Sequence, residues 1–222
     1  MSLVHSLTVF TFRLLTSLIC HIDAIQLDRV PHQGPLIIVT NHVNVLEIPI
    51  IYTRLQPRPV HGLVYADRWK HAWSRLILEI GHSIPLRRGE ADFQAIHRSL
   101  ELLKAGHILI ISPEGTRSGH GRLQVAHPGV VVIAQHSQAP LLPVGYYGAE
   151  GYKDNLSHLK RTDFHISVGQ PFRLRPQQKT SRLIRQQMLD EIMYQLAKIL
   201  PEQYRGIYSD LSHASQEYLL FI

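Results

Sequence analysis

The sequence is poor in cysteine and in charge. Its 222 residues include one cysteine, Cys20, which permits no internal disulfide and no cysteine-based metal site, and which fits a reducing compartment. Charged residues make up 18% of the chain, below the roughly one quarter that is usual for soluble proteins. The net charge is +6, yet the basic residues form no run of five or more. We therefore expect no nucleic-acid partner.

The N-terminal segment, residues 1–22, lacks the features of a signal peptide. No Lys or Arg precedes its apolar part, and no small-x-small cleavage site follows it. A membrane span is disfavoured, because Arg13 would lie near mid-bilayer at a cost of roughly 2.5–3.5 kcal/mol. Apolar residues recur at helical spacing at Leu3, Leu7, Phe10, Leu14, Leu18 and Ile22. This pattern predicts an amphipathic helix that either packs on the protein body or lies in a membrane interface.

The remaining chain alternates between strand-like and helix-like segments. Expected strands are 36–40, 61–65, 83–86, 107–112, 141–146 and 164–168, and expected helices are 48–55, 67–80, 90–104, 130–135 and 181–200. This alternation predicts an α/β fold: a mostly parallel or mixed sheet flanked by helices. The length suits a single core. We expect residues 1–25 to form the N-terminal helix and residues 26–222 to form one layered domain.

The stretch TNHVNVLEIPI follows the first expected strand and carries His42 and Glu47. Sheets of this type bind ligands beyond the carboxyl ends of their strands. A neutral imidazole can take a proton from an alcohol, and a nearby carboxylate would hold its tautomer. Alternatively, Asn44 to Glu47 fits a capping box. Pro49 argues that the helix begins nearer Glu47, since a proline deep in the helix would break a backbone hydrogen bond.

Two further segments carry groups that suit an anion. Arg87 and Arg88 follow a short strand and point to opposite sides, so one of them can face a cleft, where a guanidinium would match two phosphate oxygens. A solvated surface pair is the alternative. In SPEGTRSGHGR, residues 112–122, a buried strand runs into a carboxylate, hydroxyls, glycines and an arginine. Such a loop predicts an anion cradle in preference to an ordinary glycine-rich connection.

Together these segments resemble the glycerolipid acyltransferase superfamily, specifically the 1-acylglycerol-3-phosphate acyltransferases. The family's first motif is Asn-His, four residues and an acid, as at 41–47. Its second ends in an arginine after a short strand, as at 81–88. Its third, Pro-Glu-Gly-Thr-Arg-Ser, occurs unchanged at 113–118, and its fourth, an apolar strand carrying a proline, at 140–144. The resemblance spans residues 36–146.

This resemblance implies an enzyme of phospholipid biosynthesis that makes phosphatidic acid from lysophosphatidic acid. His42 would be the general base that deprotonates the acceptor hydroxyl, and Glu47 would orient it. The phosphate and glycerol of the acceptor would be held by Arg88, Glu114, Gly115, Thr116 and Arg117. No metal and no bound cofactor are implied, and acyl-CoA or acyl carrier protein would be the co-substrate. The family works at membranes, which favours a peripheral or monotopic protein on the cytoplasmic face.

The sequence departs from the family pattern at two positions. The acid of the first motif is usually aspartate, and here it is Glu47. Beyond the third motif, His127 stands where the family often has lysine. Both departures bear on the identity of the acceptor. Acyl transfer to another lysolipid or to a glycolipid hydroxyl, and lipid binding without turnover, are therefore alternative functions.

Overall fold

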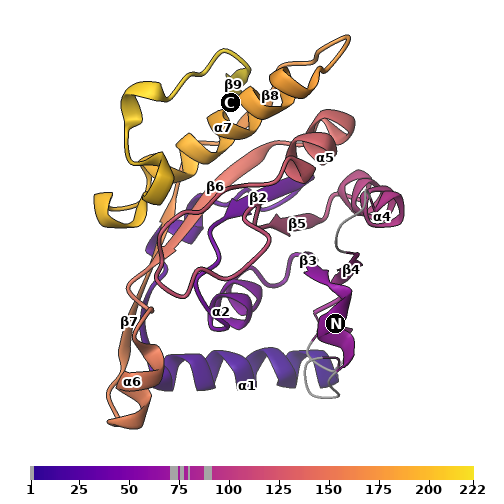
Figure 1. Cartoon of the computed structure of the whole chain (residues 1–222). Coiled ribbons are helices and arrows are strands. Elements are labelled where there is room, and N and C mark those ends of the chain that lie inside the picture. The colour runs from indigo at the N-terminus through magenta and orange to yellow at the C-terminus, as the bar shows by residue number, and fades with distance from the viewer. Residues whose placement is uncertain (1–2, 71–74, 76–77, 80, 88–91) are drawn as a thin grey trace.

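A computed structural model describes residues 3–70, 75, 78–79, 81–87 and 92–222. Over these residues nine strands form one sheet (Figure 1). The strands are β1 (Cys20–Asp23), β2 (Leu36–Thr40), β3 (Val60–Tyr65), β4 (Ile84–Leu86), β5 (Ile108–Ile111), β6 (Leu141–Tyr147), β7 (Thr162–Val168), β8 (Phe172–Leu174) and β9 (Leu219–Phe221).

The sheet is mixed and mostly parallel, as expected. Its order is β1-β7-β6-β2-β5-β3-β4, with β8 paired to β6 and β9 paired to β8. The central strand β2 runs parallel to both of its neighbours, β5 and β6, whereas β7 and β8 run antiparallel to β6. The carboxyl ends of β2, β5 and β6 therefore lie at one edge, where the first and third sequence motifs begin.

Helices cover both faces of this sheet. They are α1 (Leu3–Ile19), α2 (Glu47–Arg54), α4 (Phe93–Lys104), α5 (Gly129–Ser137), α6 (Tyr152–Ser157) and α7 (Arg182–Lys198). Short 3-10 helices are η1 (Ile25–Arg29), η2 (Ala66–Lys70), η3 (Glu202–Tyr204), η4 (Gly206–Tyr208) and η5 (Leu211–His213). In Figure 1, α1 and α2 lie below the sheet, and α5 and α7 lie above it.

Two hydrophobic cores result, one on each face. Ile37 and Val39 of β2 pack in the core that contains residues of α4, α5 and α7, whereas Leu36 and Ile38 pack in the core that contains α2. Successive strand residues point to opposite faces, so a strand covered on both sides must be apolar throughout. This explains why the run LIIVT is buried at every position.

Two predicted helix boundaries differ from the structure by three residues or more, each for a local reason. The helix expected over 90–104 begins at Phe93, because the Asp92 side chain accepts a hydrogen bond from the Ala95 N–H and caps it. The N-terminal helix was expected over residues 1–25, but α1 ends at Ile19. The chain then pairs in parallel with β7. Most of the helix expected over 67–80 lies outside the described residues.

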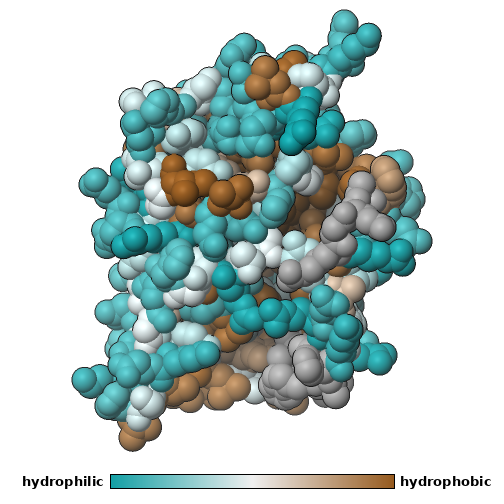
Figure 2. All heavy atoms as spheres, viewed as in Figure 1, coloured by the Kyte–Doolittle hydropathy of each residue, from teal (hydrophilic) through white to brown (hydrophobic). Residues whose placement is uncertain are grey.

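The apolar stripe of α1 faces away from the protein. Thr16 marks the inner face of the helix and is 3% exposed, whereas Leu7, Phe10 and Leu18 are 64%, 63% and 63% exposed. Figure 2 shows hydrophobic residues along the lower edge of the molecule, where Figure 1 places this helix. In the described part of the chain, none of the helices combines the length and the apolar character needed to cross a membrane.

Candidate active site

The loop that follows β2 is fastened to β6 by two asparagines. The Asn41 amide nitrogen donates to the Tyr146 carbonyl at 2.8 Å, and its oxygen accepts from the Tyr146 N–H at 2.8 Å. The Asn44 amide nitrogen donates to the Ala149 carbonyl at 2.8 Å. Because these side chains replace the strand pairing that ends at Thr40, the loop has a fixed position at the edge of the sheet.

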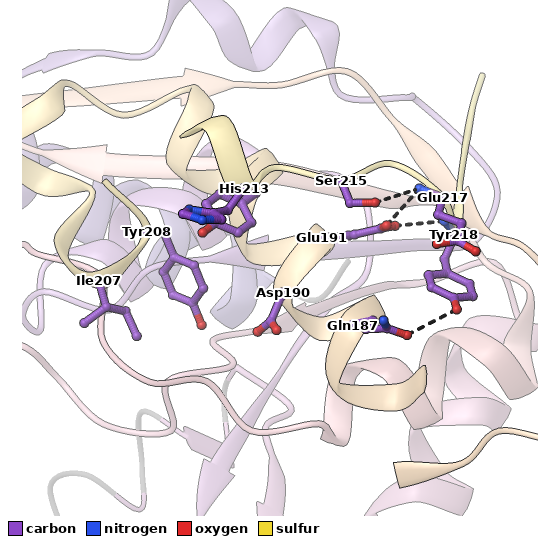
Figure 3. Close-up of a pocket in the computed structure, with 10 residues that line it drawn as sticks. Gln187, Asp190, Glu191, Ile207, Tyr208, His213, Ser215, Glu217 and Tyr218 are labelled. Carbon is purple, nitrogen blue, oxygen red and sulfur yellow. Dashed lines mark hydrogen bonds between the residues drawn. The ribbon is translucent and has the colours of Figure 1, made fainter. Parts of the chain in front are cut away.

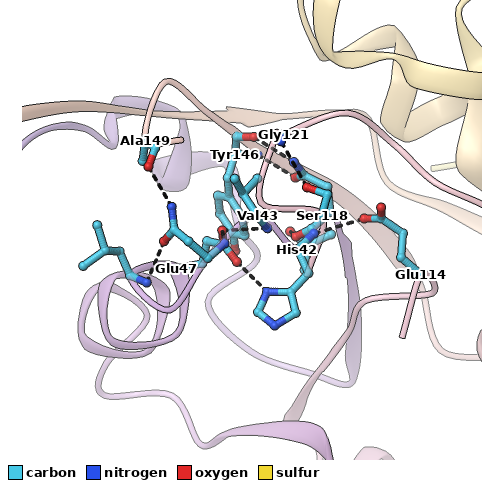
Figure 4. Close-up of polar contacts among 12 residues, drawn as sticks. His42, Val43, Glu47, Glu114, Ser118, Gly121, Tyr146 and Ala149 are labelled. Atoms are coloured by element: carbon cyan, nitrogen blue, oxygen red, sulfur yellow. Dashed lines mark hydrogen bonds and ion pairs between the residues drawn. The ribbon is translucent and has the colours of Figure 1, made fainter. Parts of the chain in front are cut away.

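His42 and Glu47 form a direct pair within this loop (Figure 4). The distance from His42 Nδ1 to Glu47 Oε2 is 2.7 Å. Glu47 is the first residue of α2 and is 3% exposed. Its other oxygen, Oε1, accepts from the N–H groups of Val43 and Asn44 at 2.8 Å and 2.6 Å. Capping contacts and the histidine pair therefore coexist, since each uses a different oxygen of one carboxylate.

The pair fixes the tautomer of His42. A carboxylate oxygen can only accept, so Nδ1 must carry the hydrogen and Nε2 of the neutral ring has a free lone pair. The His42 side chain is 26% exposed. In Figure 4 the imidazole points away from the loop backbone, with Nδ1 toward Glu47. A partly exposed imidazole in this state is able to take a proton from a bound hydroxyl.

The third-motif loop runs alongside the His42 loop. The Ser118 N–H donates to the His42 carbonyl at 2.8 Å, and the Gly119 N–H donates to the Val43 carbonyl at 3.0 Å. Gly115 has a φ of +65°, and a Cβ there would lie 2.7 Å from the Tyr65 hydroxyl oxygen. The backbone conformation therefore favours glycine at this position, and any larger residue would also need the Tyr65 side chain to shift.

The outward residues of this loop face solvent. Thr116 and Arg117 are exposed, and so is His127, whose N–H donates to the Pro113 carbonyl at 2.8 Å. The ring of His127 lies beside Gly115, 3.3 Å from where a Cβ would stand. The histidine that departs from the family pattern thus lies beside the third motif. It can meet the same ligand as that loop.

Glu114 lies on the inner side of the loop. It is 3% exposed, and its oxygens accept from the N–H groups of His42 at 3.1 Å and Gln124 at 3.0 Å. Burial raises the pKa of Glu114 to about 7; the two N–H groups oppose this rise, and the charge of Glu47 adds to it. Both oxygens of a residue expected to hold the acceptor are thus engaged with backbone.

The second motif is only partly described. Arg88 lies outside the described residues. Arg87 is exposed, and its N–H donates to Asp92 Oδ2 at 2.9 Å. The Asn41 contact could not be predicted because it joins residues that are 105 positions apart, and the Gln124 contact depends on the path of the loop that also carries Glu114. Among the described residues, no group of three or more His, Cys, Asp or Glu side chains could hold a metal ion.

Comparison with known proteins decides the family. A model of the family described as Acyltransferase matches residues 9–147. The chain belongs to this acyltransferase family. A curated relative, the 1-acyl-sn-glycerol-3-phosphate acyltransferase of Bacillus subtilis (strain 168), is 25% identical over 144 residues, which cover 65% of this chain and 70% of the relative.

A solved structure has the same fold as this acyltransferase. It is the crystal structure of the 1-acyl-sn-glycerophosphate (LPA) acyltransferase PlsC from Thermotoga maritima, with a TM-score of 0.62 and 18% sequence identity. The match covers 88% of this chain and 78% of the other. The α/β architecture with a mostly parallel mixed sheet is thereby confirmed.

A separate hollow of about 340 Å³ lies between α7 and the C-terminal segment (Figure 3). Its lining includes the tyrosines Tyr194, Tyr208 and Tyr218 and the carboxylates Asp190, Glu191 and Glu217. The Glu191 carboxylate accepts from the N–H groups of Glu217 and Tyr218 at 2.8 Å and 2.9 Å. The Glu191 carboxylate thus anchors the C-terminal segment on α7. No residue of the four motifs lines this hollow.

Proposed function

We propose that this acyltransferase transfers a fatty acyl group from a thioester to the free hydroxyl of 1-acylglycerol-3-phosphate, giving phosphatidic acid. The observation that carries the proposal is the 2.7 Å contact between His42 and Glu47, which leaves Nε2 able to accept a proton. The names of the Bacillus subtilis relative and the Thermotoga maritima structure support this acceptor.

In the proposed reaction His42 acts as general base. Nε2 takes the proton of the acceptor hydroxyl while the hydroxyl oxygen attacks the carbonyl carbon of the thioester. Glu47 stabilises the imidazolium that forms. The carbon–sulfur bond then breaks, and the imidazolium gives its proton to the departing sulfur, which leaves as a free thiol. The donor is acyl-CoA or acyl carrier protein.

The acceptor lies against the third-motif loop in this proposal. Arg117 and Thr116 are exposed and can reach a phosphate, Gly115 lets the backbone approach it closely, and Arg88 of the second motif would complete the set. A guanidinium binds phosphate through two oxygens at once, which favours a phosphorylated acceptor over a neutral one.

Apolar side chains flank the pair. Val45 and Ile48, on either side of Glu47, are 45% and 43% exposed. Apolar groups next to a catalytic base offer contact to an acyl chain, and they would lose exposed surface when it binds. In this proposal the acyl chain of the donor contacts these two side chains.

A membrane location follows from the same substrate. Lysophosphatidic acid is amphiphilic, and α1 presents Leu7, Phe10 and Leu18 outward. We propose that this helix lies in the membrane interface and holds the protein as a peripheral or monotopic enzyme on the cytoplasmic face.

Replacement of His42 or Glu47 tests the mechanism. We expect His42→Ala and Glu47→Gln each to lower turnover by a factor on the order of 10²–10⁴. The glutamine would keep the backbone contacts but could place an NH₂ group against Nδ1 and disturb the tautomer. The measurement is thiol release from palmitoyl-CoA and from palmitoyl acyl carrier protein, with lysophosphatidic acid in detergent micelles.

The control is His97→Ala, which removes a histidine on α4 whose side chain is 76% exposed. It should retain full turnover. Activity that is indifferent to His42 would contradict the general base. Binding of lysophosphatidic acid without thiol release from either donor would instead favour a lipid-binding protein, and preference for a lysolipid without a phosphomonoester would favour another acceptor.

A further inference from the structure

We propose that Glu114 is a positioning residue for His42 and does not bind the acceptor. Its carboxylate joins the peptide of His42 to the peptide of Gln124 and thereby fixes where the imidazole stands. This inference rests on the proposed function, in which His42 is the general base. It assigns Glu114 a role different from the acceptor contact implied by the family resemblance.

The direction of Glu114 supports this role. Within the third motif, Thr116 and Arg117 are exposed, whereas Glu114 is 3% exposed. In Figure 4 its carboxylate points toward the backbone of His42, with a hydrogen bond drawn between them. A ligand on the outer side of the loop meets the exposed residues first. Glu114 instead faces the protein.

His42 is held at three atoms, and the third motif supplies two of the contacts. Its N–H donates to Glu114, its carbonyl accepts from the Ser118 N–H, and its Nδ1 contacts Glu47. Glu47 sets the rotation of the ring, while Glu114 and Ser118 set the position of the peptide that carries it. Displacement of a catalytic group by about 1 Å can cost roughly 100-fold in rate.

The two partners of Glu114 explain why a carboxylate suits this place. Both partners are N–H donors, and an ionised carboxylate offers two accepting oxygens, whereas an amide offers one. Burial makes the anion unfavourable, as its raised pKa of about 7 indicates. The anion is held in place by the two N–H groups, which would lose their partner without it.

The test compares Glu114→Gln with Arg117→Gln. With saturating palmitoyl-CoA and varied lysophosphatidic acid, Glu114→Gln should lower kcat about 10- to 100-fold and leave KM for the acceptor within about twofold. Arg117→Gln should mainly raise that KM. The slow release of thiol to water, measured without acceptor, should fall in Glu114→Gln by the same factor as kcat, because His42 serves both reactions.

Glu114→Asp keeps two accepting oxygens on a shorter side chain and should retain more kcat than Glu114→Gln. It also provides the comparison if the glutamine variant does not fold. Three outcomes would each overturn the inference. The first is a rise in acceptor KM with unchanged kcat, the second is an unchanged rate of thiol release to water, and the third is unaltered kinetics in both Glu114 variants. His42→Ala separates the two proposals: if it stays active, the proposed general base fails, whereas an inactive His42→Ala with a pure KM effect at Glu114 refutes only the positioning role.

Discussion

Glu47 divides its two oxygens between the imidazole of His42 and the backbone of the loop. A five-residue spacing does not place two side chains on one helical face, and the pair forms because His42 lies before α2 while Glu47 begins it. The sequence predicted both residues and this arrangement. It could not predict that Glu114 turns inward, because the direction of a loop side chain depends on contacts with distant segments such as the one that carries His42.

At the residue scale, the raised pKa of Glu114 predicts a pH-dependent effect on stability. Its folded pKa of about 7 exceeds the ordinary value of 4.5, so between these pH values the folded protein keeps a proton that the unfolded chain releases, and above pH 7 the carboxylate is ionised. The stability that this proton contributes is present below pH 4.5 and is lost as pH rises through 7. Glutamine stays neutral, so the melting temperature of Glu114→Gln minus that of the wild type should be more positive at pH 8 than at pH 5.

Thermal unfolding followed by circular dichroism at the two pH values measures this difference. Glu202→Gln, at an exposed position in η3, is the matched control and should show nearly the same difference at both pH values. A Glu114→Gln difference that does not change between pH 5 and pH 8 would show that the carboxylate is not penalised in the folded state.

At the element scale, the sequence located the long elements and the short strand β4, which was expected over 83–86, but it missed the other three short strands. The expected strand 36–40 matches β2, whereas β1, β8 and β9 have three or four residues each, too few for alternation to be recognised. Pairing with distant partners defines these strands. Side-chain contacts contribute as well. The Arg161 guanidinium donates to the carbonyls of Ser17 and Cys20 at 2.6 Å each and so helps to end α1 where β1 begins.

The hydrogen bonds that attach the His42 loop to β6 are an element-scale feature, and their loss should measurably lower the free energy of unfolding. Asn41→Ala would leave the buried N–H and carbonyl of Tyr146 without their side-chain partner. Each unsatisfied group costs about 1–3 kcal/mol, so we expect the free energy of unfolding to fall by roughly 3 kcal/mol. Urea denaturation measures this change in the free energy of unfolding. Asn155→Ala, which removes a part-buried contact to Thr162, should cost under about 1 kcal/mol. Equal losses of unfolding free energy in the two variants would refute the idea that Asn41 attaches the loop to β6.

At the whole-molecule scale, composition and alternation predicted one mixed sheet between helices, and the structure confirms it. The orientation of α1 could not be predicted in the same way. Helical spacing identifies an apolar face, but a face can meet either the protein body or a membrane. In the structure α1 uses its Thr16 side for packing and leaves the stripe of Leu7, Phe10 and Leu18 exposed. The helix α1 therefore presents an exposed apolar face.

This orientation predicts that the stripe governs membrane binding. Replacement of Leu7, Phe10 and Leu18 by serine should weaken binding to phospholipid vesicles about 100-fold or more, since each buried large apolar side chain contributes roughly 1.5–3 kcal/mol. Vesicle sedimentation measures the binding. The control replaces Phe93, Leu159 and Leu183, which are 78%, 93% and 68% exposed on other elements, by serine. If both triple variants lose binding equally, general hydrophobicity and not α1 attaches the protein. If neither does, the proposed interface helix is wrong.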